Sequence, residues 1–197
     1  MQISSRAQNI EPFYVMEVAK AATKLGNQVA HTDAPMVFLN IGEPDFTAPP
    51  LVQEAAQCAV RNGQSQYTPA TGLPQLRDCI NAWYTTRFGV QVPASRIVVT
   101  AGASAALHLA CMALIESGDE ILMPDPSYPC NRHFVSAAEG KAVLIPTTAE
   151  ERYQLSAAKV EAAWGQRTRG VLLASPSNPT GTSIHPDELR RIHQVVQ

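Results

Sequence analysis

The stretch Arg96–Ala110, RIVVTAGASAALHLA, decides the fold expected for this chain. It opens with the β-branched run Ile97–Val99, passes through a turn of small residues, and continues in good helix formers from Ala105. A strand that turns sharply into a helix exposes the first N–H groups of the helix, which have no intrahelical partner and attract anions. We therefore predict a phosphate on the N–H groups of Ala103 and Ser104. The alternative is an ordinary turn between strand and helix, without a ligand.

Strands and helices alternate regularly after this stretch. The expected strands are nearly continuous apolar runs, which is typical of strands buried on both faces. They are expected at Arg96–Thr100, Glu120–Pro124, Ala142–Pro146 and Gly170–Ala174, with helices at Ala103–Ile115, Tyr128–Glu139 and Ala157–Trp164. This alternation predicts an α/β fold, with a mostly parallel sheet that carries helices on both faces.

The remaining segments of the chain are predicted from helical spacing and from turn residues. We expect helices at Pro12–Leu25, Leu51–Arg61, Pro74–Phe88 and Asp187–Gln197, and a short strand at Met36–Ile41. Gly26 and Gly89 are expected to end the first and third of these helices. The last helical pattern continues to Gln197 without a cap, and no strand follows it. We therefore expect the sheet to lack its last strands.

Composition excludes several classes of protein. The chain has 197 residues, is 16% charged and carries a formal net charge of −2, so it has no basic excess for binding nucleic acid. No apolar run is long enough to span a membrane, and the N-terminus lacks the apolar core of a signal peptide. We expect one sizeable domain with part of a second, in a cytoplasmic protein that binds neither nucleic acid nor a membrane.

Cysteine and histidine spacing gives no indication of a metal site or a disulfide framework. The four cysteines form no C-x-x-C pair, and none of the five histidines is paired at metal-ligand spacing. Three cysteines lie in helical patterns, where cysteine acts as a small apolar residue: Cys58, Cys79 and Cys111. We therefore predict no metal ligand and no catalytic cysteine.

The most specific stretch is Ser175–Thr182, SPSNPTGT. Asn178 lies between two prolines after a buried strand, so its backbone is fixed and its amide is available to a ligand. A plain proline turn is the alternative. In a parallel sheet, ligands bind at the carboxyl ends of the strands. Gly102–Ser104 and Asp125–Tyr128 follow other expected strands, so the three stretches should converge at that edge.

Five motifs together resemble the class I/II aminotransferases, which are fold-type-I enzymes that use pyridoxal 5′-phosphate. The motifs occur in the family's order: NIGEPDF (Asn40–Phe46), YTPATGLPQLRDCI (Tyr67–Ile80), TAGASAAL (Thr100–Leu107), PDPSYP (Pro124–Pro129) and SPSNPTGT. The resemblance implies that residues 1–45 are an N-terminal segment belonging to the small domain. It also implies that residues 46–197 are the cofactor-binding large domain, incomplete at its C-terminus.

The resemblance implies roles for six residues. Ala103 and Ser104 would hold the cofactor phosphate, in agreement with the expectation from the helix N-terminus. Tyr128 would stack on the pyridine ring, and Asn178 would donate a hydrogen bond to the cofactor's phenolic oxygen. In the other two motifs, Gly42 would border the substrate carboxylate, while Tyr67 would reach the phosphate site of the neighbouring subunit in a homodimer.

The family's catalytic lysine, which forms an imine with the cofactor, would follow Gln197, so no catalytic residue is assigned in this chain. The four lysines present are poor candidates: Lys20, Lys24, Lys141 and Lys159. The resemblance therefore implies the N-terminal portion of an aminotransferase, which transfers an amino group between an amino acid and a 2-oxo acid. By itself this chain would be inactive or nearly so.

Three alternatives remain open. A related lyase-type enzyme with the same fold would show the same motifs. The ligand-sensing domain of a transcription regulator is disfavoured because the N-terminus lacks a basic recognition helix. A non-catalytic half-domain would expose apolar surface and unpaired strand edges.

Overall fold

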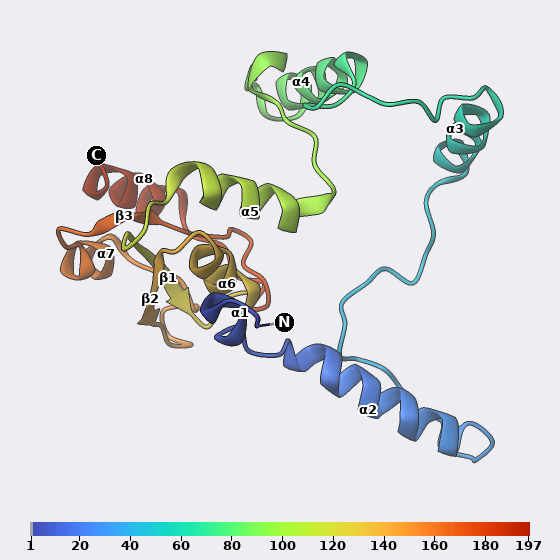
Figure 1. The fold of residues 1–197 in the computed structure, drawn as a ribbon, viewed down its shortest axis with the longest axis horizontal. Helices are drawn as coiled ribbons and strands as arrows, with labels where there is room; N and C mark the ends of the chain where they lie inside the picture. Colours follow the sequence, from blue (N-terminus) through green and yellow to red (C-terminus); the bar gives the residue numbers. More distant parts are fainter. Residues whose placement is uncertain (1) are drawn as a thin grey trace. The chain divides into compact units, whose positions relative to one another are not determined.

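The computed structural model describes residues 2–197, which form two compact units. The first unit combines residues 2–14 with Ala103–Gln197, and the second is Val15–Gly102. Figure 1 shows the order of the elements along the chain. The boundary between small and large domain at residue 45 stays a prediction.

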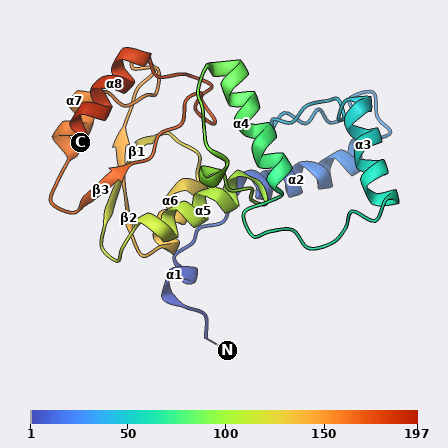
Figure 2. The ribbon, with the colours of Figure 1, turned by 90° about the horizontal axis from the view of Figure 1, so that it is seen from above.

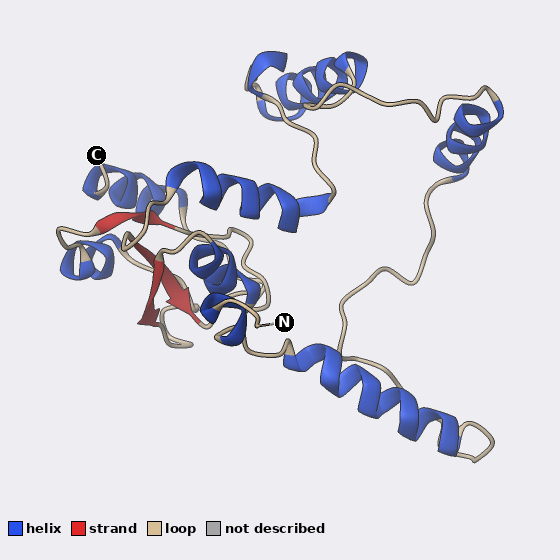
Figure 3. Cartoon of the chain, in the orientation of Figure 1, coloured by secondary structure: helices blue, strands red, loops and turns tan. Residues whose placement is uncertain are grey.

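A parallel three-stranded sheet forms the centre of the first unit (Figure 3). Its strands are β1 (Glu120–Asp125), β2 (Lys141–Pro146) and β3 (Thr168–Val171), in the order β2-β1-β3. In the central strand, Leu122 lies opposite Val143 on one side and Val171 on the other. The three predicted strands of this region are thus confirmed within a few residues.

Helices cover both faces of this sheet (Figure 2). On one face, Ile121 and Met123 pack with Cys111 of α5 (Gly102–Leu114) and Val135 of α6 (Cys130–Ala137). On the other face, Leu122 packs with residues of α7 (Ala157–Ala163) and α8 (Pro186–Val195). Consecutive strand residues point to opposite faces. A continuous apolar strand is therefore required, and the α/β fold with helices on both faces is confirmed.

A short helix, α1 (Ser5–Gln8), belongs to the same unit. Ser4 caps it by accepting the N–H of Ala7 on its hydroxyl. Helix α1 packs against α6, and Arg6 forms an ion pair with Glu139 just beyond the end of α6, with 2.9 Å between Nη1 and Oε1. The short N-terminal segment therefore has defined contacts in this unit.

The second unit contains the other helices. They are α2 (Tyr14–Val29), which begins at the junction of the units, α3 (Pro50–Arg61), α4 (Pro74–Phe88) and the 3₁₀ turn η1 (Ala94–Arg96). Arg77 of α4 donates to the Ala94 carbonyl at 2.9 Å through Nε and to the Thr71 hydroxyl at 3.1 Å. The guanidinium thus fastens η1 and the preceding loop to α4.

Two of the predicted strands are wrong: Met36–Ile41 and Arg96–Thr100 form no strand in the described part of the chain. Ile97 has the extended backbone expected of a strand, at φ −106° and ψ 125°. A strand also needs a partner for its backbone groups. Val99 donates one backbone hydrogen bond, to Thr71 at 3.0 Å, which does not continue as a ladder. The β-branched residues therefore favour an extended backbone, but they cannot supply the neighbouring strand with which it would pair.

The predicted helix stop at Gly26 is also wrong, because α2 continues to Val29. The glycine has a packing role instead. A Cβ at Gly26 would lie 3.2 Å from Cζ of Phe38 and 3.5 Å from Cβ of Met36. A glycine inside a helix costs only about 1 kcal/mol relative to alanine, so the close approach of this segment to α2 outweighs it.

The amino ends of the three strands meet at one partly buried carboxylate. Glu120, at the start of β1, forms ion pairs with Lys141 and Arg167, each at 3.1 Å, while its own side chain is 16% exposed. The hydrogen bond from Lys141, with the charges of Lys141 and Arg167, lowers the pKa of Glu120 below its ordinary value of 4.5 against the opposing effect of desolvation. This cluster favours the charged carboxylate in the folded protein.

We expect this cluster to make folding sensitive to acid. A carboxylate whose pKa is lower in the folded state stabilises the fold above its unfolded pKa, and that stability is lost as the pH falls through the folded pKa. The free energy of unfolding should therefore fall below about pH 4.5, and less steeply in Glu120→Gln. Urea unfolding across this range measures the slopes. Glu161→Gln, at an exposed position in α7, is the control, and equal slopes in wild type and Glu120→Gln would contradict the prediction.

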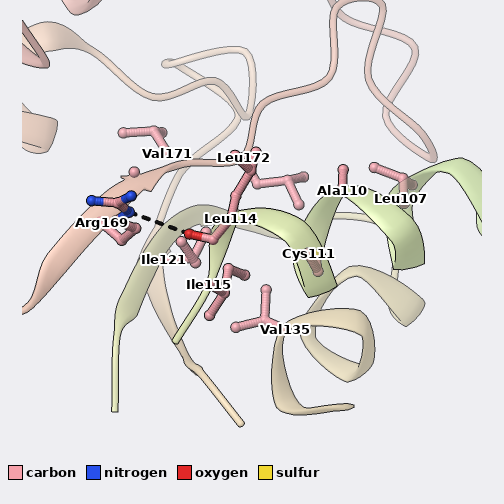
Figure 4. A pocket seen from close by; sticks show the side chains of 11 residues that line it. Leu107, Ala110, Cys111, Leu114, Ile115, Ile121, Val135, Arg169, Val171 and Leu172 are labelled. Carbon is pink, nitrogen blue, oxygen red and sulfur yellow. Dashed lines mark hydrogen bonds between the residues drawn. The ribbon is translucent and has the colours of Figure 1, made fainter. Parts of the chain in front are cut away.

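An apolar groove of about 450 Å³ lies between α5 and β3 (Figure 4). It is lined mainly by aliphatic side chains, among them Leu107, Ile115 and Leu172, and Arg169 closes one end by donating to the Leu114 carbonyl at 3.2 Å. The opposite side of α5 is apolar as well, with Met112 56% exposed. A helix that is hydrophobic all round is normally buried.

We expect the 197-residue chain by itself to self-associate through the exposed apolar side of α5 that carries Met112. Light scattering should show species larger than a monomer, and Met112→Glu should shift them toward the monomer because the charge resists burial. Gln194→Glu, at an exposed position of α8, is the control and should have no effect. A monomeric wild-type chain that unfolds cooperatively would contradict the prediction.

Candidate active site

The N-terminus of α5 presents free donors. Gly102 has φ +83°, a left-handed conformation that suits glycine, and its N–H donates to the Thr100 carbonyl at 2.8 Å. The next two N–H groups, of Ala103 and Ser104, have no protein acceptor in the part of the chain described, and both residues are exposed. A Cβ built on Gly102 would meet nothing within 4 Å. The turn therefore offers two backbone donors and the Ser104 hydroxyl to an anion.

A tightly bonded loop carries Asn178. Within it, the N–H of Ser177 donates to the Thr182 carbonyl and the N–H of Gly181 donates to the Ser177 carbonyl, both at 2.8 Å. The Ser175 hydroxyl accepts the N–H of Ile184 at 3.0 Å. Asn178 itself is exposed, and its side chain makes no hydrogen bond within the described residues. The loop is fixed while the amide stays available.

A second loop anchors the first. The buried side chain of Gln154 donates from Nε2 to the carbonyl and the hydroxyl of Thr182, at 2.8 and 3.0 Å. The Thr182 hydroxyl in turn donates to the Arg152 carbonyl at 2.6 Å. Because Gln154 is buried, breaking its two bonds would leave its amide unsatisfied, so they hold the loop that bears Asn178 in one position.

Tyr128 lies in the turn after β1, partly buried. Its carbonyl accepts the N–H of Asn131 at 3.0 Å, and its ring contacts Phe13 edge to face, with 6.1 Å between ring centroids. The hydrogen bond between the phenol and the Cys130 thiol, together with burial, raises the pKa of Tyr128 above its ordinary value of 10.0. The phenol therefore stays neutral, as a ring that stacks on an aromatic ligand should.

Four of the six predicted site residues belong to the first unit. Tyr128 and Asn178 follow β1 and β3, at the carboxyl ends of parallel strands. Helix α5 contacts Arg169 at the start of β3 through Leu114, its last residue. Its first turn, with Ala103 and Ser104, therefore faces the other end of the sheet. This is the edge where ligands bind in such sheets.

Gly42 and Tyr67 belong to the other unit, Val15–Gly102. Tyr67 is fully exposed in a loop. The segment around Gly42 lines a cavity of about 420 Å³ with α2, to which Phe38, Asn40 and Glu43 contribute. The structure does not test the roles of any of the six residues, so these stay predictions.

Three lysines already have acceptors. Lys159 donates to the Glu151 carboxylate at 2.7 Å and to the Pro146 carbonyl at 2.8 Å. Lys141 pairs with Glu120, and Lys20 pairs with Glu17 at 2.7 Å. The carboxylate of Glu151 has its pKa lowered, first by the hydrogen bond from Lys159. The expectation that the imine lysine lies outside this chain stays a prediction.

Sequence reasoning missed the residues that support the site rather than those that line it. Phe13 and Gln154 contact Tyr128 and Thr182 from distant parts of the chain. Neither residue lies in a motif, so no local signal identifies them. No group of three or more metal-binding side chains occurs in residues 2–197. No described helix is both long and apolar enough to cross a membrane.

In parallel α/β sheets, helix N-termini bind anions and ligands bind at the carboxyl edge of the sheet. Residues 34–197 match the sequence profile of aminotransferase class I and II, so the chain belongs to this family. This confirms the resemblance found in the five motifs.

The relatives agree with this assignment. A valine–pyruvate aminotransferase of Mycobacterium tuberculosis is 41% identical over 183 residues, which cover 93% of this chain and 46% of the relative. A probable aspartate aminotransferase of Methanocaldococcus jannaschii is 34% identical over 99% of this chain and 49% of the relative.

Solved structures share the fold. An aminotransferase from Mycobacterium tuberculosis superposes with a TM-score of 0.89 at 39% identity, covering 99% of this chain and 49% of that one. Aspartate aminotransferase from Thermus thermophilus with maleate gives 0.91 at 30% identity, covering 99% and 50%. The chain therefore spans about half the length of the relatives it matches.

Proposed function

We propose that these residues act within a pyridoxal 5′-phosphate-dependent aminotransferase, which moves an amino group from an amino acid to a 2-oxo acid. The observation that carries the proposal is the N-terminus of α5, where the N–H groups of Ala103 and Ser104 have no protein acceptor among the residues described. Family membership supports the cofactor, because class I and II aminotransferases share it.

The donors and rings present fit this cofactor. The α5 turn offers N–H groups and a hydroxyl to a phosphate, and it carries no side chain that would fill the space above Gly102. Tyr128 offers a neutral ring, and Asn178 offers an unengaged amide. When bound, the cofactor supplies a conjugated ring that accepts the electron pair left on the substrate carbon as its proton departs.

Each residue of this chain then has a definite task. Ala103 and Ser104 donate to the phosphate and thereby fix the position of the cofactor. Tyr128 covers one face of the pyridine ring and excludes water from it. The Asn178 amide donates to the phenolic oxygen, which favours the charged form of that oxygen. Gly42 leaves room beside the substrate carboxylate because it has no side chain.

We further propose a homodimer in which Tyr67 reaches the phosphate site of the neighbouring subunit. Its complete exposure supports this, since a fully exposed tyrosine ring is available to a second chain. A two-fold dimer would place each subunit's tyrosine at the other's site. The cytoplasmic location, the amino acid substrate and the 2-oxo acid substrate belong to the same proposal.

The experiment begins with the intact mass of the protein isolated from its own cells, followed by assays of that protein with a panel of amino donors. We expect a polypeptide about as long as the relatives, with the absorption of bound cofactor and formation of a 2-oxo acid from the donor. Elimination products without amino transfer would indicate a lyase-type enzyme. A protein that binds no pyridoxal 5′-phosphate would overturn the proposal.

A further inference from the structure

The N-terminal strap, which we define as residues 4–13, runs along α6 in the opposite direction. Near the end of α6, Arg6 pairs with Glu139. Midway, Asn9 and Glu11 share a cavity of about 400 Å³ with residues of α6 and β2. The strap ends at Phe13, which contacts Tyr128 just before α6 begins. Figure 1 shows α1, the helical part of the strap, beside α6.

The contact at the end of the strap is between two aromatic rings. The centroids of Phe13 and Tyr128 are 6.1 Å apart and the rings are inclined by 79°. This edge-to-face arrangement is favourable beyond the area it buries. Both residues are partly buried, whereas the next aromatic residue along the chain, Tyr14, is 66% exposed.

The backbone of Tyr128 is fixed, but its ring needs a neighbour. The N–H of the buried residue Asn131 donates to the Tyr128 carbonyl and closes the turn. The second side-chain torsion of a tyrosine is broad, so packing decides how the ring is turned. Phe13 is the aromatic residue that packs against this ring in the described part of the chain. The strap therefore helps to set the orientation of the ring, together with the hydrogen bond between the phenol and the Cys130 thiol.

We propose that Phe13 is a positioning residue for Tyr128. It holds the phenol ring in the orientation in which Tyr128 covers the pyridine ring of the cofactor. The inference rests on the proposed function, and it adds a residue from outside the family motifs to the cofactor site. Phe13 acts through Tyr128 and makes no contact with the reacting atoms.

A double-mutant cycle in the whole protein tests this inference. The dissociation constant of pyridoxal 5′-phosphate is measured by absorption titration for wild type, Phe13→Ala, Tyr128→Ala and the double variant. We expect Phe13→Ala to weaken binding about five-fold, from the typical strength of an aromatic pair. In the Tyr128→Ala background the same change should have almost no effect, because the ring that it positions is absent. Phe13→Tyr should restore wild-type affinity.

Two controls separate positioning from a general loss of structure. Tyr14→Ala removes a ring of similar size one residue away and should leave affinity unchanged. In the cofactor-free protein with labelled tyrosines, Phe13→Ala should shift the ring resonances of Tyr128 and leave those of Tyr153 in place. This second measurement needs no cofactor.

The outcomes are distinguishable. An equal loss of affinity in both backgrounds, or unshifted Tyr128 resonances, would overturn the inference alone. A wild-type protein that binds no cofactor would overturn the proposed function and this inference with it. A loss confined to the wild-type background, together with the shifted resonances and rescue by Phe13→Tyr, would support both.

Discussion

Replacing Ser104 with glutamate (Ser104→Glu) should lower the affinity for pyridoxal 5′-phosphate about 100-fold, because like charges a few ångströms apart repel strongly near a protein surface. The carboxylate would occupy the end of α5, where the free N–H groups of Ala103 and Ser104 would otherwise bind the phosphate. The helix should tolerate the change, since a negative charge in its first turn interacts favourably with the helix dipole. This variant should therefore lose affinity for the cofactor while keeping its thermal stability.

Two matched variants sharpen this test. Ser104→Ala removes only the hydroxyl and should weaken binding about five-fold, the typical effect of one hydrogen bond. Ala106→Glu adds the same charge in the same turn, but residues two apart do not share a face of a helix, so its effect should be several times smaller. Absorption titration measures affinity and thermal unfolding measures stability. A Ser104→Glu variant that binds as tightly as wild type would place the phosphate elsewhere.

The helices and strands that were predicted correctly are those whose deciding residues lie within the element or next to it. Helix α4 begins at Pro74 and ends at Phe88, as predicted. The proline at its first position has a φ suited to a helix. Gly89 ends the helix at φ +66°, with its N–H on the Thr85 carbonyl. The apolar runs of β1, β2 and β3 were identified for a similar reason, since burial on both faces leaves a continuous pattern.

The failures share one physical cause, which is a partner distant in sequence. Arg96–Thr100 has β-branched residues and extended backbone, but a strand exists only where another strand accepts and donates its hydrogen bonds. Gly26 has the composition of a helix stop, yet Phe38 packs against it and the helix continues. In both cases the neighbouring residues set a preference for one secondary structure, and tertiary contacts decide which secondary structure forms.

The residues of the candidate site also fall into two groups, those that a short motif reveals and those that only the structure reveals. The motifs around Ser104, Tyr128 and Asn178 could be found because each combines turn residues with a chemical group in a short stretch. The contacts that hold those groups in place could not be found from the sequence. Gln154 secures the asparagine loop through Thr182, and Phe13 contacts Tyr128, in each case across a long separation in sequence. A motif thus identifies the group that touches a ligand, while the fold supplies the support.

The central strand provides the prediction with the largest effect on stability. Leu122→Ala should lower the free energy of unfolding by about 3 kcal/mol, within the usual range for a buried leucine. Leu122 is 0% exposed and packs with Leu155, Val160 and Ile192 on one face of the sheet. Neighbouring strands fix its position on both sides, so these side chains cannot move far enough to fill the cavity.

Urea unfolding of the whole protein measures this effect, and Leu189→Ala provides the matched control. Leu189 is the same residue type on α8, but it is 45% exposed, so its truncation should cost no more than about 1 kcal/mol. The difference between the two variants depends on burial alone, since the chemical change is identical. If both variants lost equal stability, the two-faced sheet would not be the core of this unit. The carboxyl edge that holds Tyr128 and Asn178 would then lack the rigid support on which the proposed site depends.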